Sequence, residues 1–144
     1  MRLVSEVIER ISEESEVSSS ALSWALRDSM ATILEELMAS GEFLGATVSS
    51  IDGIAWAERL QPGFDKHRFA AMSSSLLAIS DELANEQRCG PTRNMLIEGE
   101  AGKIVIMHAG PMLLLTLFST ETVTLGMVMA HAKQAADKLA SMRI

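Results

Sequence analysis

The chain has 144 residues, a length that fits one domain with a full hydrophobic core. Apolar residues make up 48% of it and charged residues 22%, which excludes a largely disordered chain and a coiled-coil rod. The formal net charge of −7 repels phosphate backbones, so we expect no nucleic-acid partner. The single cysteine, Cys89, excludes an internal disulfide and fits a reducing compartment.

The first part of the chain is expected to be an extension of the domain. Residues 1–14 place apolar side chains at helical spacing, and residues 12–20 are rich in Ser and Glu. Because charged residues interrupt the start, it lacks the apolar region of a signal peptide. We predict an N-terminal helical extension and linker over 1–18, a single domain over 19–144 and a cytoplasmic location. The apolar stripe of the extension would pack on its own domain, on a second subunit or on a partner.

A longer helix and a hairpin follow the extension. Apolar residues recur every third or fourth position over 22–37, and Gly41 follows as a stop signal. The period then changes to two over 44–51 and 54–59, which predicts two strands. The dipeptide Asp52-Gly53 between them is typical of a tight hairpin turn.

A second helix is predicted from about Asp65 to Arg88, where Gly90-Pro91 ends it. Its apolar stripe consists of Phe69, Met72, Leu76, Ile79 and Leu83. Small residues, Ala and Ser, surround this stripe. We expect one apolar face to cover the sheet and the remaining small-residue surface to stay free.

Three more strands are predicted over 94–99, 103–108 and 112–119. The third of these has no polar alternation, which indicates a central strand covered on both faces. A last helix is predicted over Glu121–Arg143, with Glu121 in its first turn and with Leu125 among its inward-facing residues.

The uncharged stretch Ile104–Thr120 approaches the length of a membrane span. His108 and Gly110-Pro111 interrupt it, so we interpret it as two buried strands joined by a turn, and we expect no membrane span.

The predicted fold class is α/β (α+β), a three-layer sandwich. Hairpin connections force antiparallel pairing, so the five strands should form one antiparallel sheet. We expect one helix on one face and two on the other, with the first and last long helices sharing a face.

Four segments in this order resemble the roadblock (dynein light chain) family, in particular its bacterial and archaeal MglB-like members. They are GATVSSIDGIAWA, FAAMSSSLLAISDELANE, MLIEGEAGKIVIMHAGPMLLLTLF and TLGMVMAHAKQAADKL. The resemblance covers about Ala21–Met142. It implies a roadblock/profilin-like fold for this part of the chain and does not extend to residues 1–18.

No catalytic constellation is visible in the sequence. The three histidines, His67, His108 and His131, have no Cys or carboxylate at zinc spacing, and Cys89 has no paired base. The chain also lacks a GxSxG elbow and both glycine-rich phosphate loops. We therefore expect a protein that is not an enzyme, with no catalytic residue, no metal and no cofactor.

Two features predict self-association into a homodimer. The strand over 94–98 is apolar at Met95, Leu96 and Ile97, and no Pro or Lys protects it from pairing with another edge strand. The second feature is the small-residue surface of the second helix, which would let another helix approach closely. The helix residues predicted to lie in the dimer interface are Ala71, Ser74, Ser75 and Ala78.

The resemblance implies a regulator or scaffold in signalling that binds a small Ras-like GTPase and influences its nucleotide state. The residues predicted to meet this partner lie on the exposed sides of the second helix: Lys66, Arg68, Asp81, Glu82, Asn85 and Glu86. The alternative is a small-ligand-sensing signalling module without a GTPase partner. In that case the Met-rich interior and the polar Ser49-Ser50 strand would line a pocket.

Overall fold

A computed structural model of the chain describes residues 23–40 and 42–142. The predicted extension over 1–18 lies outside the described residues. Residues 23–39 are helical and are called the N-terminal helix below. The elements that follow are β1 (Phe43–Ser50), β2 (Ala55–Arg59), α2 (Lys66–Glu86), β3 (Asn94–Gly99), β4 (Gly102–His108), β5 (Leu113–Thr120) and α3 (Leu125–Ala140).

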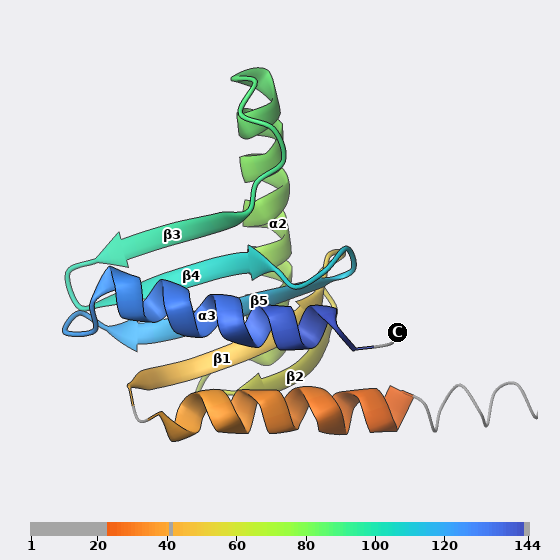
Figure 1. Cartoon of the computed structure of the whole chain (residues 1–144), viewed down its shortest axis with the longest axis vertical. Helices are drawn as coiled ribbons and strands as arrows, with labels where there is room; N and C mark the ends of the chain where they lie inside the picture. The colour runs from red at the N-terminus through yellow and green to blue at the C-terminus, as the bar shows by residue number, and fades with distance from the viewer. Residues whose placement is uncertain (1–22, 41, 143–144) are drawn as a thin grey trace, which may run out of the picture.

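The five strands form one sheet in the order β2-β1-β5-β4-β3, and all pairs are antiparallel (Figure 1). Strand β5 lies in the middle, where Leu115 pairs with Val48 on one side and with Met107 on the other. Six of its eight residues are buried, which confirms the prediction of a central strand covered on both faces. Strands β2 and β3 are the two edges.

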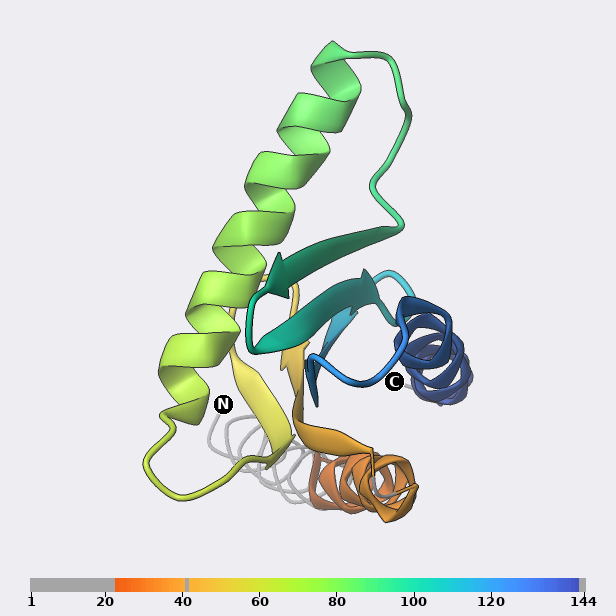
Figure 2. The same cartoon turned by 90° about the vertical axis from the view of Figure 1, so that its left-hand side faces the viewer.

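The N-terminal helix and α3 cover one face of the sheet, and α2 alone covers the other (Figure 2). The core on the two-helix face joins Met30 and Leu34 of the N-terminal helix to Leu115 and Leu117 of β5 and to Leu139 of α3. These five side chains are almost fully buried, with exposed fractions of 0–1%. The predicted three-layer sandwich and the helix pair on one face are therefore confirmed.

The face of α2 that covers the sheet differs from the predicted one. Its buried residues are Ala70, Ser73 and Leu77, while Ile79 and Leu83 of the predicted apolar stripe are more than 60% exposed. Small residues face the sheet because the helix approaches it closely. The Thr116 hydroxyl of β5 donates to the Ser73 hydroxyl at 3.1 Å, a contact that a larger residue at position 73 would prevent.

The start of α3 also differs from the prediction. Thr124 is the N-cap and its hydroxyl accepts the Met127 amide, so the helix begins at Leu125, four residues after Glu121. Glu121 therefore lies before the helix instead of in its first turn, and Leu125 is 42% exposed instead of inward-facing. Lys138 lies in the last turn of α3, where a cation interacts favourably with the helix dipole.

The end of α2 contains a strained residue that gives a stability prediction. Among the described residues, Arg88 alone combines a side chain with a positive φ, 59°. The Cys89 amide donates to the Ala84 carbonyl at 2.8 Å across this left-handed cap, where glycine is usual. Arg88→Gly should therefore raise the free energy of unfolding by about 0.5–1 kcal/mol in urea denaturation. Gln87→Gly is the matched control, because its φ of −88° suits any residue, and it should be neutral or destabilising. A destabilised Arg88→Gly variant would contradict the strain argument.

Candidate functional site

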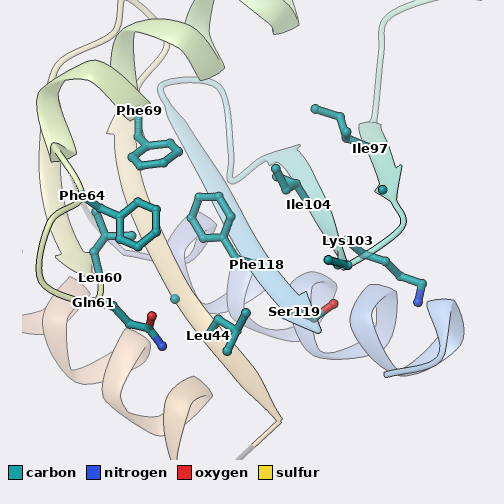
Figure 3. A pocket seen from close by; sticks show the side chains of 14 residues that line it. Leu44, Leu60, Gln61, Phe64, Phe69, Ile97, Lys103, Ile104, Phe118 and Ser119 are labelled. Carbon is teal, nitrogen blue, oxygen red and sulfur yellow. The ribbon is translucent and has the colours of Figure 1, made fainter. Parts of the chain in front are cut away.

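A cavity of about 410 Å³ opens on the α2 side of the sheet, between the first turn of α2 and the β3–β4 hairpin (Figure 3). Its walls are almost entirely apolar. The apolar side chains that line it are Leu44, Leu60, Phe64, Phe69, Ile97, Ile104 and Phe118. We call it the phenylalanine pocket.

Three aromatic rings form one wall of the phenylalanine pocket. The ring of Phe69 on α2 lies 5.7 Å from that of Phe64 and 5.3 Å, edge to face, from that of Phe118 on β5. The lining also includes Gly45, Gly99 and Gly102, which have no side chains to occupy the space. The hollow therefore lies between glycines of the strands and the bulky rings.

The polar groups at this pocket are few and do not converge. Gln61 and Ser119 lie at its border, and the Lys103 side chain leads away from the rings (Figure 3). The Lys103 ammonium donates to the Glu121 and Val123 carbonyls at 2.9 and 2.8 Å, so it is occupied within the fold. The arrangement offers an apolar surface for binding and no assembled acid, base or nucleophile.

Helix α2 carries an exposed apolar surface close to this pocket. No residue of α2 after Leu77 is buried, and the helix continues past the edge strand β3 (Figure 1). The exposed fractions of Met72, Ile79 and Leu83 are 50%, 63% and 61%. Because successive members of this set are seven and four residues apart, they share one side of the helix. This side has no partner within the described part of the chain.

Edge strand β3 presents the predicted apolar residues. Met95 is partly buried, and Leu96 and Ile97 are 36% and 38% exposed. Ile97 lines the phenylalanine pocket and so faces α2, while Leu96, with opposite parity, faces the other side of the sheet. β4 pairs with one edge of β3, and its other edge is open, which leaves backbone groups free to pair.

The small residues predicted for the dimer interface lie in two environments. The Ser74 hydroxyl donates to the Ile51 carbonyl at 2.5 Å, and Ala71 lies against Gly53, so both border the β1–β2 turn. Ser75 and Ala78 are exposed. Ser75 is four residues before Ile79, which places it beside the exposed apolar side of α2.

Two of the predicted partner-binding residues make contacts within the fold. The Asp81 carboxylate accepts the Thr92 amide at 3.2 Å and lies 3.9 Å from the His108 imidazole. The Lys66 ammonium lies 3.5 Å from the Glu58 carboxylate. The other four are exposed on α2: Arg68, Glu82, Asn85 and Glu86.

The serines predicted to line a ligand pocket, Ser49 and Ser50, do not lie at the phenylalanine pocket. Ser49 is fully buried and its hydroxyl has no hydrogen-bond partner, and neither serine lines the phenylalanine pocket. Within ranges 23–40 and 42–142, no three His, Cys, Asp or Glu side chains come together as a metal site would require. None of the helices in these ranges is long and apolar enough to cross a bilayer.

The sheet order, the antiparallel pairing and the split of helices define a class of small α/β sandwich domains. The sequence profile of the Roadblock/LC7 domain matches residues 30–119, more than half of the chain. The uncharacterized protein MJ0310 of Methanocaldococcus jannaschii is 32% identical over 110 residues, covering 76% of this chain and 96% of that protein. The chain belongs to the Roadblock/LC7 domain family.

Solved structures of MglB are similar to this fold. Myxococcus xanthus MglB gives a TM-score of 0.74 at 17% identity, with 79% of this chain and 86% of that chain covered. A structure described as MglB with tetrameric arrangement gives a TM-score of 0.71 at 26% identity, with 81% and 88% covered. The predicted resemblance to MglB-like roadblock proteins is thereby confirmed.

Proposed function

We propose that this protein is a non-enzymatic, homodimeric regulator or scaffold of the cytoplasm that binds a small Ras-like GTPase and influences its nucleotide state. Membership of the Roadblock/LC7 family supports the proposal, together with the likeness to MglB. The single observation that carries the homodimer is the apolar side of α2 (Met72, Ile79 and Leu83), which is at least half exposed and lies near the open edge of β3.

This surface has the properties of a two-fold contact. Pairing of the open β3 edges would extend the sheet across the axis and would satisfy backbone groups. It would also bring the two α2 helices side by side on the same face. Ile79 and Leu83, which are more than half exposed in the single chain, would then be buried against the second copy.

The GTPase would meet the outer surface of the paired α2 helices. Arg68, Glu82, Asn85 and Glu86 are exposed on α2, and neither of the contacts that hold Lys66 and Asp81 involves them. Because Glu82 and Glu86 lie three and seven residues after Ile79, they border the apolar side of α2, and the GTPase would meet them at the margin of the helix pair. A regulator of this kind acts by biasing the switch segments of the GTPase, because the residues offer no assembled catalytic group. Such bias requires a difference in affinity between the two nucleotide states.

Calorimetry with GTPases of the same genome, loaded with GDP or with a GTP analogue, tests this function. We expect at least tenfold tighter binding of one nucleotide state, a difference of about 1.4 kcal/mol. The double variant Glu82→Lys and Glu86→Lys should weaken that binding at least tenfold. Lys133→Glu on α3, which covers the opposite face of the sheet, is the matched control and should bind as the wild type does.

Equal affinity for both nucleotide states would remove the regulatory role and leave scaffolding. Failure to bind any of the GTPases would reject the proposal.

The phenylalanine pocket favours one alternative, the small-ligand-sensing module. Its volume and apolar lining suit a small apolar molecule. Native mass spectrometry of the purified protein distinguishes the two functions. A bound molecule that dialysis removes, together with an absence of GTPase binding, would favour the sensor.

A further inference from the structure

Both tryptophans of the chain lie where the start of the N-terminal helix meets edge strand β2. Trp24 belongs to the first turn of that helix, and Trp56 stands on β2. The Arg27 guanidinium lies 5.2 Å from the centre of the Trp56 ring, so this part of the helix is beside β2 (Figure 1). Because Trp24 and Arg27 are three residues apart, they share one side of the helix. We call Trp24, Arg27 and Trp56 the tryptophan patch.

The tryptophan patch is incompletely covered. Trp24 is 67% exposed, and among residues 23–39 it is the one large apolar side chain that is exposed. Met30 and Leu34 of the same helix are almost fully buried in the core. Trp56 is partly buried, and in the described part of the chain β2 has no neighbouring strand on its outer side. An exposed tryptophan beside an open sheet edge is typical of a surface that another segment covers.

Residues 1–22 directly precede the tryptophan patch in the sequence. The N-terminal extension within this range is too short to be a stable helix on its own, so its apolar stripe needs an apolar surface to cover it. The stripe consists of Leu3, Val7, Ile8 and Ile11. Helices packed in bundles are commonly joined by about 2–8 residues, so a link over 15–22 lets 1–14 turn back on the N-terminal helix. A tether of this length also holds the stripe at an effective concentration on the order of 1 mM, which favours its own chain over a second copy.

We propose that the N-terminal extension turns back and covers the tryptophan patch of its own chain with its apolar stripe. Docking removes Trp24 and the stripe from water at once. The inference goes beyond the proposed function and does not depend on it, because the Roadblock/LC7 profile begins only at residue 30. Strand β2 is the edge of the sheet opposite to β3, so a covered patch leaves the proposed two-fold contact free.

Acrylamide quenching of tryptophan fluorescence tests the proposal in the full chain, because both tryptophans belong to the patch. Trp56→Phe leaves Trp24 as the single reporter. In this background the double variant Val7→Ser and Ile11→Ser removes half of the apolar stripe. We expect it to raise the quenching constant of Trp24 about twofold, because the ring then loses its apolar cover.

The matched control is the double variant Glu9→Ser and Glu13→Ser. It introduces the same two serines at the same spacing, on the opposite side of the predicted helix, and should leave the quenching constant unchanged.

Trypsin cleavage after Arg10 is a second readout, and it does not require Trp56→Phe to fold. Docking of the extension slows this cleavage, because a protease acts on the open state. Trp24→Ser replaces an exposed side chain, so the domain should fold as the wild type does. We expect this variant to accelerate cleavage after Arg10 at least fivefold, measured by mass spectrometry of the fragments.

A quenching constant that Val7→Ser and Ile11→Ser leave unchanged would overturn the proposal, and so would cleavage that Trp24→Ser does not accelerate. Quenching of the wild-type background that weakens as the protein concentration rises would assign the cover to a second copy and overturn docking within one chain.

Discussion

Leu115→Ala is expected to lower the free energy of unfolding by about 2–5 kcal/mol, the range for removing a leucine from a well-packed core. Leu115 is fully buried in the middle of the central strand, between Val48 and Met107 of the neighbouring strands. It belongs to the core that joins the N-terminal helix and α3 to the sheet. Truncation to alanine therefore leaves a cavity among close-packed side chains, which adds to the loss of stability. Urea denaturation at a fixed protein concentration measures the loss, since the proposed dimer would make stability depend on concentration.

Leu125→Ala is the matched control for this prediction. Leu125 is the same residue type at the first turn of α3 and is 42% exposed, so the same truncation should cost less than about 1 kcal/mol. Equal losses at the two positions would contradict the assignment of Leu115 to the centre of the core.

Strand positions could be predicted from the sequence because their signals are local. The structure places β3 over the predicted residues 94–99, and the other four strands begin and end within one residue of the predicted bounds. Hairpin turns fix antiparallel pairing, and the unbroken apolar run of β5 fixes its central place. The predicted start of α3 at Glu121 is four residues too early. Residues before Thr124 are also compatible with a helix start, and only the structure shows that Thr124 is the N-cap.

The orientation of α2 could not be predicted in the same way. Hydrophobic periodicity identifies an apolar side of a helix, and in a single chain that side normally covers the sheet. Here the side with Ala70 and Ser73 covers the sheet surface, where the Thr116 hydroxyl of β5 donates to the Ser73 hydroxyl. The side chains on that surface of the sheet come from strands that are not adjacent to α2 in the sequence, so the periodicity of α2 does not indicate them. The sequence alone therefore misassigns to the core a stripe that the structure leaves exposed.

The phenylalanine pocket could not be predicted from the sequence either, for a related reason. Gly45, Gly99 and Gly102 come from three separate strands, so no local sequence signal connects them. They lie around one hollow with Phe69 and Phe118 only after the sheet has formed. Position 102 shows how tight the surrounding backbone is, since a Cβ there would lie 2.6 Å from the Ser119 carbonyl oxygen.

Lys103→Met is expected to lower the free energy of unfolding by about 1–3 kcal/mol, the cost of leaving buried carbonyl groups without donors. Lys103 is only 8% exposed, and its ammonium joins β4 to the turn before α3 through the carbonyls of Glu121 and Val123. Methionine keeps an unbranched side chain out to the ε position and removes the ammonium donor, so most of the packing is conserved while both hydrogen bonds are lost. The turn ends at Thr124, so its loosening should also disturb the N-cap of α3.

Amide hydrogen exchange gives the specific readout of this contact. In Lys103→Met, exchange should accelerate over residues 121–128 more than over the centre of β5, because the lost hydrogen bonds hold the turn and not the sheet. The matched control is Lys133→Met, an exposed position on α3, which should change neither stability nor exchange appreciably. If Lys103→Met leaves the turn as protected as in the wild type, the two carbonyl contacts do not hold α3 at the sheet. The junction would then depend on the buried apolar side chains of Val123 and Val128 alone.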